Sequence, residues 1–404
     1  MDSPDILVIG AGAIGSATAY ELAKRGARVL VLEQAGVTSG ATGASEGMVH
    51  SFAKRPLGIE TTLGIESFAM YPRLAEELGM EFDFLPKPRI IVIDDEGHLD
   101  VMERWAARKR SAGLEEELLD RKAVHDVEPL LGDRIVGGVY TPTQGVVNPM
   151  LLARAYLGGV VRRGGAVANY EPVVRIDREG DRVVAVHSAR RRFTPGLVVN
   201  AAGIGAAAIA DMVGLTIEIV PKRAHMLVSE VIPADTFRCA VSCSRNVIAG
   251  LNPVTLQYED NPGDPAAKAA EQFSPWQLSS FTSVKNGNML FCGGFAFAGL
   301  DKSVDTKVVT AMSANIKHIV PAWGALRIIR AWAGLEPCTS DNNLILGRPR
   351  ALQNFYFAAG HGNAGVMMSS ASGVVLAELI TTGTCHLPAE MIATADPDRF
   401  NGHG

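Results

Sequence analysis

Three glycines and one glutamate near the N-terminus have the spacing of a site that binds a dinucleotide. Gly10, Gly12 and Gly15 follow the apolar run at residues 6–9, and Glu33 ends the next apolar run, eighteen residues after Gly15. The first glycine allows a sharp turn, the second lets the backbone approach a pyrophosphate, and the third lets helix and strand pack closely. The phosphates would then lie at a helix N-terminus, where free N–H groups and the helix dipole favour negative charge. An acid placed like Glu33 accepts hydrogen bonds from ribose hydroxyls and repels a 2′-phosphate.

A buried strand, a helix and a second parallel strand have to position these four residues. The run at residues 6–9 is unbroken, which is typical of a strand buried on both faces. A helix is expected over about residues 14–25, Gly26 ends it, and the apolar run at 29–32 predicts the next strand. Strand, glycine turn, helix, strand and acid in this order are far more specific than the glycine spacing alone. The sequence therefore predicts a dinucleotide-binding βαβ unit.

Two later segments repeat the plan of an apolar strand that ends in small residues. Residues 197–203 lead through Gly203 into an alanine-rich helix, and residues 355–365 lead through Gly360 into a helix of small residues. Three such turns, far apart in the sequence, suggest a cofactor long enough to be touched three times. This favours FAD over NAD, and a NAD-dependent dehydrogenase is the rival that the opening motif alone leaves open.

The length, charge and hydropathy of the chain exclude several other classes. At 404 residues the chain exceeds the usual size of a single core, so two domains are expected. The net charge of −5 and the pI near 6.0 provide no basic footprint for nucleic acid. No stretch approaches about 20 apolar residues without a charge, so no transmembrane segment is expected. The chain reaches its first strand within a few residues, which leaves no secretory signal and favours a cytoplasmic protein.

Five scattered cysteines are an odd number, which argues against a disulfide framework in a chain of this size. Cys239 and Cys243 are four residues apart, and no second pair of Cys or His residues has metal-ligand spacing. No metal is therefore expected.

Along nearly its whole length the sequence resembles the family of D-amino-acid, glycine and sarcosine oxidases, which are flavoenzymes. The segments that carry the resemblance are residues 8–15, 199–203, 332–335 and 358–365. Within the family the chain is most similar to the β-type subunits of heteromeric enzymes that oxidise sarcosine, D-hydroxyproline or opines. Residues 288–294, followed by Gly299, Leu300 and Asp301, carry this second resemblance.

The resemblance implies an α/β fold in which a Rossmann-like FAD-binding domain is interleaved with an α+β substrate domain built on a mixed sheet. The FAD domain would comprise residues 1–85, 148–220 and 330–390. The substrate domain would comprise 86–147 and 221–329, and a polar tail at 391–404 would be loosely ordered. The implied reaction is FAD-dependent oxidation of the C–N bond of an amine or amino acid by hydride transfer, after which the imine hydrolyses.

The residues expected to contact FAD lie in the glycine-rich turns and in segments that approach the flavin in relatives. They are Gly10, Gly12, Ala13, Ile14, Gly15, Glu33, Gln34, Gly43, Ala44, Ser45, Val173, Ala201, Gly203, Trp332, Gly334, Gly360, Gly362, Asn363, Ala364, Gly365 and Val366. Some relatives attach their flavin through a cysteine or histidine. Cys338 lies near that cysteine's place without coinciding with it, and His50 lacks a matching context, so non-covalent FAD is predicted.

At two positions the sequence lacks the residue by which family members hold the substrate carboxylate, and this changes the substrate that we expect. D-Amino-acid and glycine oxidases hold the substrate carboxylate with an arginine where this chain has Glu336, and monomeric sarcosine oxidases use a lysine where Met367 is the closest match. Our hypothesis is that Glu336 contacts a cationic or secondary amine, while Lys54, Arg55 or Arg223 holds any carboxylate. The alternative is that Glu336 pairs with Arg223 or another base and touches no substrate.

His361, at the start of the last glycine-rich turn, either stabilises the reduced flavin together with the helix N-terminus or is simply hydrogen-bonded within the turn. The predicted substrate is sarcosine-like, D-hydroxyproline-like or opine-like. The alternatives are a D-amino-acid dehydrogenase, a cyclic-amine oxidase, or a flavin-carrying subunit of a larger dehydrogenase complex with partner subunits. Oxygen, a quinone or a partner's iron–sulfur centre would each reoxidise the flavin, and no motif selects among them.

Overall fold

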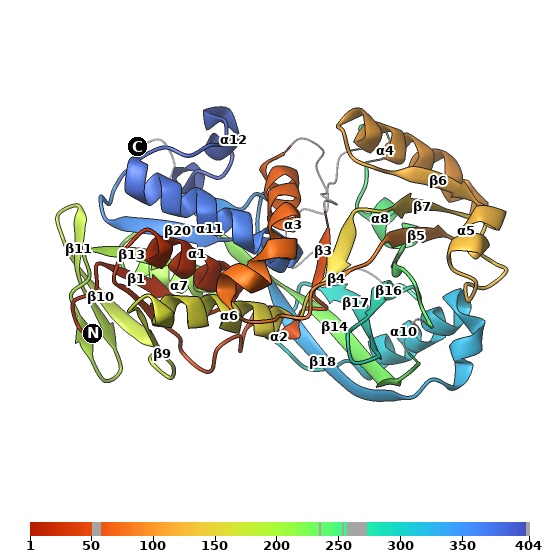
Figure 1. The fold of residues 1–404 in the computed structure, drawn as a ribbon, viewed down its shortest axis with the longest axis horizontal. Helices are drawn as coiled ribbons and strands as arrows, with labels where there is room; N and C mark the ends of the chain where they lie inside the picture. Colours follow the sequence, from red (N-terminus) through yellow and green to blue (C-terminus); the bar gives the residue numbers. More distant parts are fainter. Residues whose placement is uncertain (51–57, 234–235, 253, 257–272, 401–404) are drawn as a thin grey trace.

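The computed structural model describes residues 1–50, 58–233, 236–252, 254–256 and 273–400, and these form two lobes, each built on its own large sheet (Figure 1). The first sheet has six strands in the order β19-β20-β13-β1-β2-β9. These strands are β1 (Ile6–Ile9), β2 (Val29–Leu32), β9 (Ala166–Ala168), β13 (Leu197–Asn200), β19 (Ile345–Gly347) and β20 (Phe355–Ala359). β19 pairs antiparallel with β20, and the other neighbours are parallel.

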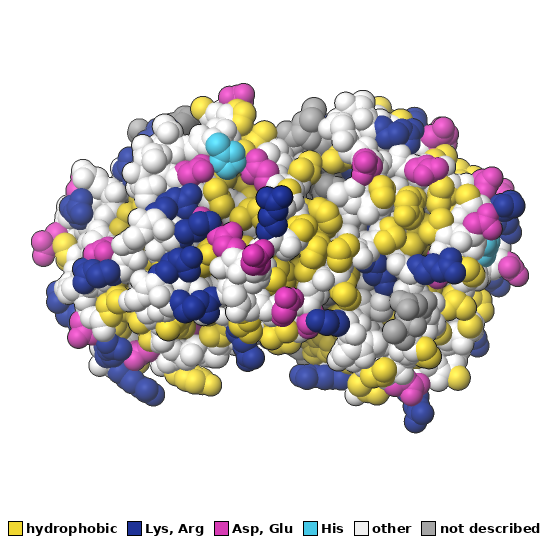
Figure 2. Space-filling model, in the orientation of Figure 1, with side chains coloured by type: hydrophobic (Ala, Val, Ile, Leu, Met, Phe, Trp, Pro, Cys, Tyr) yellow, Lys and Arg dark blue, Asp and Glu magenta, His cyan; other side chains and the backbone are white. Residues whose placement is uncertain are grey.

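The surface of the lobes carries both signs of charge. On the face shown in Figure 2, Lys and Arg side chains are interspersed with Asp and Glu side chains. That face therefore has no continuous basic patch of the kind that binds nucleic acid.

Strand β1 is buried on both faces, as its unbroken apolar run predicts. Successive side chains of a strand point to opposite faces, and Ile6 and Val8 accordingly pack into one core cluster while Leu7 and Ile9 pack into another. The first sheet is thus the middle layer of a lobe with two cores.

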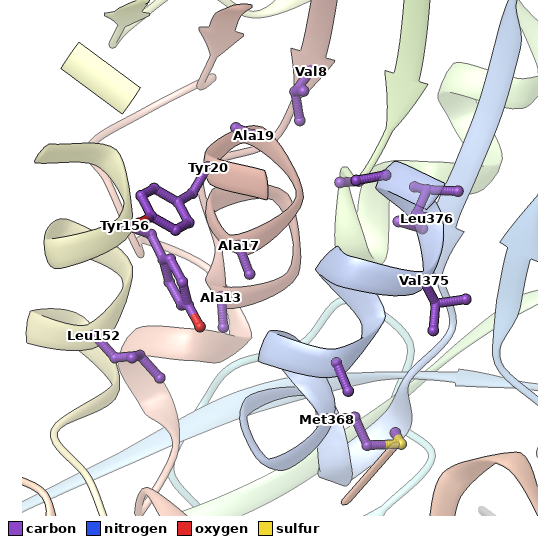
Figure 3. Packing of buried hydrophobic residues seen from close by; sticks show 14 of the residues in the cluster. Val8, Ala13, Ala17, Ala19, Tyr20, Leu152, Tyr156, Met368, Val375 and Leu376 are labelled. Atoms are coloured by element: carbon purple, nitrogen blue, oxygen red, sulfur yellow. The ribbon is translucent and has the colours of Figure 1, made fainter. Parts of the chain in front are cut away.

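Four helices cover one face of this sheet: α1 (Ala13–Lys24), α3 (Ile59–Leu78), α6 (Pro149–Arg162) and α11 (Gly365–Thr382). Figure 3 shows Tyr20 of α1 beside Tyr156 of α6, with ring centroids 5.6 Å apart. On the other side of α1, a Cβ atom at Gly373 would lie 2.8 Å from the backbone carbon of Ala17. Small residues therefore let α11 approach α1 closely, which orders the helix that begins at the last glycine-rich turn.

The other face of the sheet packs against α7 (Ala206–Asp211) and a small antiparallel sheet. That small sheet consists of β10 (Val173–Glu179), β11 (Arg182–Ser188) and β12 (Arg192–Phe193). Ile176 and Phe193 from the small sheet join Leu7 and Ile9 in the second core cluster.

The second lobe is built on an eight-stranded mixed sheet in the order β18-β14-β17-β16-β15-β5-β7-β6. Its strands are β5 (Arg89–Ile93), β6 (Glu117–Asp120), β7 (Gly137–Thr141), β14 (Ile219–Val231), β15 (Ala240–Cys243), β16 (Leu278–Ser283), β17 (Asn288–Ala296) and β18 (Ile328–Thr339). β5 and β15 are parallel, and the remaining pairs are antiparallel. The mixed sheet predicted from the resemblance is therefore confirmed.

Strand β5 shows how this sheet is covered. Ile90 and Val92 pack on the side of α10 (Thr306–Ile319), whereas Ile91 and Ile93 pack on the side of α4 (Leu99–Ser111) and α8 (Ser244–Ala249). A short helix, α5 (Arg121–Val127), follows β6. Between the lobes lies a three-stranded sheet of β3 (Met48–His50), β8 (Gln144–Val146) and β4 (Leu85–Pro86), preceded in sequence by α2 (Ala41–Ala44).

The division into two interleaved domains stands as our proposal, with one refinement from the strand bounds. The strands of the six-stranded sheet come from the ranges assigned to the FAD domain. The boundary at residue 330, however, falls inside β18, which pairs with β14 from Ile328 to Thr339. β14 and β18 are the long strands that run from the second lobe toward the first (Figure 1).

Residues 391–400 at the C-terminus are ordered in the structure. The prediction that the tail is loosely ordered from residue 391 is therefore wrong for 391–400. Leu346 donates a backbone hydrogen bond to Ala395, and Arg399 pairs with Asp341 at 2.7 Å. In the described part of the chain one helix, α11 with its preceding turn, is long and apolar enough to cross a membrane, but 61% of it is buried inside the protein, as expected for a core helix.

Candidate functional site

A single large cavity of about 1860 Å³ connects the glycine-rich turns of the first lobe with β14, β17 and β18 of the second. Pockets for one small ligand usually hold roughly 300–1,000 Å³. This cavity therefore has room for a dinucleotide and for a second, smaller molecule beside it.

The first glycine turn has a conformation that only glycines allow. Gly10 has a φ of 110°, and a Cβ atom there would overlap the carbonyl oxygen of Ala201. A Cβ atom at Gly15 would overlap the carbonyl oxygen of Gly10. Both glycines are thus required for the close packing of β1, its turn and α1. Gly12 lines the cavity, and a Cβ atom there would lie 3.1 Å from the Thr42 hydroxyl oxygen.

Glu33 is buried at the end of β2 and lines the same cavity. Its Oε2 atom accepts a hydrogen bond from the Ala11 N–H at 2.9 Å, and its Oε1 atom accepts one from the Ala35 N–H at 3.0 Å. Each carboxylate oxygen can accept a second hydrogen bond. Glu33 can therefore fix the glycine turn and still bind ribose hydroxyls, as the fit of a dinucleotide requires.

Thr42, which the sequence analysis missed, contacts the N-terminus of α1. Its hydroxyl oxygen accepts a hydrogen bond from the Ala13 N–H at 3.0 Å, and Thr42 lines the cavity. Other N–H groups of the first turn of a helix have no partner within the helix. A phosphate bound there would meet free N–H donors, the positive end of the helix dipole and a hydroxyl group. The run of small residues around Thr42 was the only sequence signal for this contact.

The two later turns lie on the same cavity. Gly203, Gly360 and Gly362 have φ values of 57°, 71° and 54°, which place them in the left-handed region that favours glycine. All three line the cavity together with the first turn. The three turns that are predicted to touch one cofactor thus lie on one cavity, although they are far apart in the sequence.

Apart from Val173, every residue that was predicted to contact FAD lines this cavity. Val173 lies at the start of β10 and packs, partly buried, against the second core cluster of the first lobe, and its contact with FAD stays a prediction. The alternation of side chains along β10 turns this position toward apolar neighbours.

His361 is buried, and its Nε2 atom lies 3.1 Å from the hydroxyl oxygen of Ser372 in α11. Burial lowers the pKa of His361 to about 4, so the ring is neutral at neutral pH. A neutral ring carries no charge to stabilise a reduced flavin. The structure therefore favours the simpler alternative, in which His361 is neutral and hydrogen-bonded to its surroundings at the start of the turn.

Strand β18 packs against Ala44, which lies at the end of α2 in the segment that follows β2. The Trp332 indole N–H donates to the Ala44 carbonyl oxygen at 3.3 Å, and a Cβ atom at Gly334 would lie 2.5 Å from the Ala44 Cβ atom. Only glycine at position 334 allows this approach. The contact brings the residues after Ala44 next to the second half of β18.

Glu336 lines the cavity two residues beyond Gly334, as the substrate hypothesis requires. Lys222 of β14 lies directly opposite Glu336 in the strand pairing, whereas Arg223 lies opposite Leu335. Neighbouring residues of a strand point to opposite faces, and the Arg223 guanidinium instead pairs with Asp301 at 2.5 Å. Of the bases that could pair with Glu336 in the alternative, the strand register places Lys222 rather than Arg223 across from it. Arg223 also lines the cavity.

Lys222 is buried, and its Nζ atom lies 5.0 Å from the ring centroid of Phe295 and 5.7 Å from that of Phe297. These distances suit a cation–π interaction. Lys222 was not predicted from the sequence because it is adjacent to Arg223. Only the register of β14 and β18 shows which of the two side chains lies beside Glu336. Lys54 and Arg55, the other predicted carboxylate anchors, lie outside the described residues.

A second carboxylate, Glu46, lines the cavity close to Glu336 and was also missed. The Ser280 hydroxyl group donates to it, with oxygen–oxygen distances of 2.9 and 3.1 Å to its two carboxylate oxygens. Burial raises the pKa of Glu46 to about 7, the negative charge of Glu336 adds to this rise, and the Ser280 hydrogen bond opposes it. The charged side chains that line the cavity beside one another at this place thus include the two acids Glu46 and Glu336 and the base Lys222.

Comparison with known proteins agrees with this geometry. A family model described as FAD dependent oxidoreductase matches residues 5–379. Glycine oxidase from Geobacillus kaustophilus is 26% identical over 388 residues, which are 93% of this chain and 92% of that protein. Human mitochondrial sarcosine dehydrogenase is 25% identical over 389 residues, which are 94% of this chain, and the match spans 40% of the length of that longer protein. Among solved structures, L-proline dehydrogenase from P. horikoshii superposes with a TM-score of 0.84 and 24% identity, over 99% of this chain and 98% of that chain.

Proposed function

Because the chain belongs to the family of FAD-dependent oxidoreductases, we propose that it oxidises the C–N bond of a secondary or N-substituted amino acid or amine. Bound FAD supplies the acceptor for the hydride in this reaction. The residues of the chain must bind the substrate, keep its nitrogen neutral at the moment of reaction and limit access of water. The imine product then hydrolyses to a carbonyl compound and a smaller amine.

The observation that carries the proposal is the position of Glu336 on the wall of the cofactor cavity, opposite Lys222. In the D-amino-acid and glycine oxidases that the sequence resembles, an arginine at this place holds the substrate carboxylate. A glutamate at that place repels a carboxylate and attracts a protonated amine. Lys222 supplies the positive charge for a carboxylate one strand away. A substrate with a cationic nitrogen and an acid group matches both.

The secondary-amine class receives support from the sarcosine dehydrogenase relative, since sarcosine is an N-methylated amino acid. D-Hydroxyproline and opines share this feature, because their nitrogen also carries two carbon substituents. A primary D-amino acid and a cyclic amine without a carboxylate are the competing substrates, and each would use only part of the charge pattern of Glu336 and Lys222.

We also propose that the chain works with partner subunits, on the basis of the resemblance of residues 288–294 to the β-type subunits. Co-purification from the native source, followed by size-exclusion chromatography, tests this assembly. A flavin that is reduced by amine in the isolated chain would assign the oxidation step to this chain rather than to a partner.

The substrate proposal is tested by mixing the purified yellow protein anaerobically with a panel of compounds. The panel contains sarcosine, D-proline, D-hydroxyproline, an opine, D-alanine and a cyclic amine without a carboxylate. Fast bleaching of the flavin absorbance by N-substituted amino acids is expected. Bleaching by D-alanine alone would contradict the proposed substrate class, and a protein without flavin absorbance that reduces NAD would contradict the cofactor.

A further inference from the structure

We propose that Glu46 and Glu336 form one receptor for the protonated nitrogen of the substrate, in which Glu46 accepts the proton that the nitrogen must lose before oxidation. This inference rests on the proposed amine oxidation and assigns to Glu46 a role in it. Glu336 would supply the negative charge that attracts the ammonium group. Two sets of contacts among the described residues, together with the charges around them, support the pairing.

The first set of contacts fixes the backbone on both sides of Glu46. Ala44 is fixed against β18 by the Trp332 hydrogen bond and by the close approach of Gly334. After Glu46 the chain turns sharply at Gly47, which has a φ of 81° and where a Cβ atom would overlap the Val147 carbonyl oxygen. The backbone on both sides of Glu46 is thus fixed by contacts that only glycine permits.

The second set of contacts orients the side chain. Ser280 of β16 is buried, and its hydroxyl group donates to the Glu46 carboxylate. Ser280 lies opposite Cys292 of β17 in the strand pairing, and Cys292 also lines the cavity. The Glu46 carboxylate therefore reaches from the first lobe onto the sheet of the second lobe, at the cavity wall.

The charged and titratable groups around Glu46 come from three strands. Glu336 on β18 acts on both Glu46 and the thiol of Cys292 on β17, and Lys222 on β14 lies opposite Glu336 and acts on Cys292. Burial, together with the charges of Glu46 and Glu336, raises the pKa of Cys292 well above its usual range, so the thiol is neutral. Two acids and one base remain, and with both acids ionised the net charge favours a cationic guest.

The chemistry needs a proton acceptor of this kind. An alkylammonium ion has no nitrogen lone pair, so the C–N bond cannot gain double-bond character until one N–H bond breaks. That proton forms an O–H bond on Glu46, and the lone pair stays on nitrogen. The lone pair then forms the second C–N bond as the α-hydrogen leaves with its two electrons. Every atom and electron is accounted for with FAD as the hydride acceptor.

The environment of Glu46 makes it a better acceptor than an ordinary carboxylate. Its pKa of about 7, compared with 4.5 for an ordinary glutamate, improves the proton-transfer equilibrium about 300-fold. A general base is most effective when its pKa lies near the working pH. Glu46 would still be ionised in a substantial fraction of molecules at neutral pH, which lets it bind and deprotonate the ammonium group.

The test uses the FAD-loaded protein and the best amine of the panel. The rate constant of anaerobic flavin reduction at saturating amine is measured by stopped flow from pH 5.5 to 10. In the wild type it should rise with pH through about 7. In Glu46→Gln this rise should disappear and the rate at pH 7 should fall about 100-fold, within the range that a general base contributes. As the pH approaches the pKa of the free amine, activity should partly return, because a growing fraction of the substrate then binds already neutral.

Two further variants should shift the pH at which the rate rises, in opposite directions. A purely structural role of Glu46 would produce neither shift. Glu336→Gln removes the negative charge that raises the pKa of Glu46, so the rise should move to lower pH, and the dissociation constant of the amine should increase about tenfold. Ser280→Ala removes the hydrogen bond that lowers this pKa, so the rise should move to higher pH. If Glu46→Gln fails to fold, these two shifts still decide the question.

The matched control is Glu230→Gln, which neutralises a carboxylate on β14 that pairs with Arg327 away from the cavity. It should leave the pH profile unchanged. Wild-type bleaching by amines combined with an unaltered profile in Glu46→Gln, or with no shift in the other two variants, would overturn the inference and leave the proposed amine oxidation standing. A wild type that no amine bleaches would instead refute the proposed function itself.

Discussion

The carboxylate of Glu33 accepts a hydrogen bond from the backbone N–H of Ala11 at 2.9 Å, which ties the end of the second strand to the glycine turn after the first. The other carboxylate oxygen accepts from the N–H of Ala35. One side chain thus fixes the two backbone segments that would enclose the adenosine part of FAD. Because both segments line the cavity, the shape of the cofactor site depends on Glu33 even before a ribose binds.

Replacing Glu33 with alanine should weaken FAD binding by about 10- to 100-fold. Hydrogen bonds to charged groups contribute about 1.5–3 kcal/mol each, and the substitution removes those to the turn and to the ribose. The dissociation constant can be measured by quenching of FAD fluorescence on titration of the apoprotein. Glu390→Ala, at an exposed position of α12 (Ala389–Ala393), is the control. Equal affinities of the two variants would refute a role for Glu33.

A Gly10→Ala substitution should destabilise the protein more than Gly26→Ala. Both glycines have positive φ, of 110° and 93°, so both substitutions introduce backbone strain. Only at Gly10 would the new Cβ atom overlap a backbone carbonyl group, while at Gly26 nothing lies within 4 Å. We expect about 1 kcal/mol for Gly26→Ala and at least about 2 kcal/mol more for Gly10→Ala. Denaturant unfolding of the apoproteins measures the difference, and similar losses would contradict the close packing described for the first turn.

Stability should fall as the pH decreases from about 6.5 to 4, in part because of His361. Its pKa of about 4 in the folded protein lies below the 6.5 of an unfolded histidine. In this range the unfolded chain binds a proton that the folded protein does not, so unfolding is favoured by up to about 3 kcal/mol at the acidic end. The variant His361→Gln keeps a hydrogen-bonding side chain but does not titrate. Its free energy of unfolding should depend less steeply on pH in this window, and identical slopes would contradict the burial of a neutral His361.

Lys222→Met should raise the KM of a substrate that has a carboxylate, by about tenfold, and should change the KM of an amine without a carboxylate much less. The expectation follows from the position of Lys222 opposite Glu336 at the cavity wall. Arg223→Met is the matched control, since Arg223 pairs with Asp301 instead. Steady-state kinetics with both substrates separates the cases. If Arg223→Met raises the KM of the carboxylate-bearing substrate more than Lys222→Met does, Arg223 would be the residue that binds the carboxylate.

FAD should be released as free yellow cofactor when the protein is precipitated with acid. Cys338 is buried in β18, and its sulfur lies 3.8 Å from the position of a Cβ atom at Gly362. The prediction of non-covalent binding comes from the mismatch between Cys338 and the attachment position in relatives. Absorbance of the supernatant and of the redissolved pellet measures the distribution, and yellow colour retained by the pellet would contradict it.

The parts of the fold that local sequence dictates were predictable. Strand β1, the Gly10 turn, helix α1 and strand β2 follow one another within residues 6–32, and each has its own signal of hydrophobic run, glycine or helix end. The mixed sheet required the family resemblance, because β5 pairs with β15 at a distance of about 150 residues. The boundary proposed at 330 falls inside β18, because β18 is one continuous strand whose second half lines the cavity.

The substrate side of the cavity was harder to predict. Glu336 was singled out as a departure from relatives, but its partner followed from the register of β14 and β18, which no local pattern encodes. Glu46 gave no signal, since its burial and its perturbed pKa depend on Ser280 and Glu336, more than 200 residues away. Charged side chains at such sites are recognised only when the fold has brought them together.

The most direct test of the central claim compares an N-methylated amine with an alcohol, both of which carry the same CH2–carboxylate unit. Sarcosine and glycolate are each added anaerobically, in excess, to the purified FAD-loaded protein, and the flavin absorbance is followed. If the protein oxidises C–N bonds through a site with Glu46 and Glu336, sarcosine or the best N-substituted amino acid of the panel should bleach the flavin, and glycolate should not. Bleaching by glycolate, with no amine of the panel bleaching the flavin, would contradict the account.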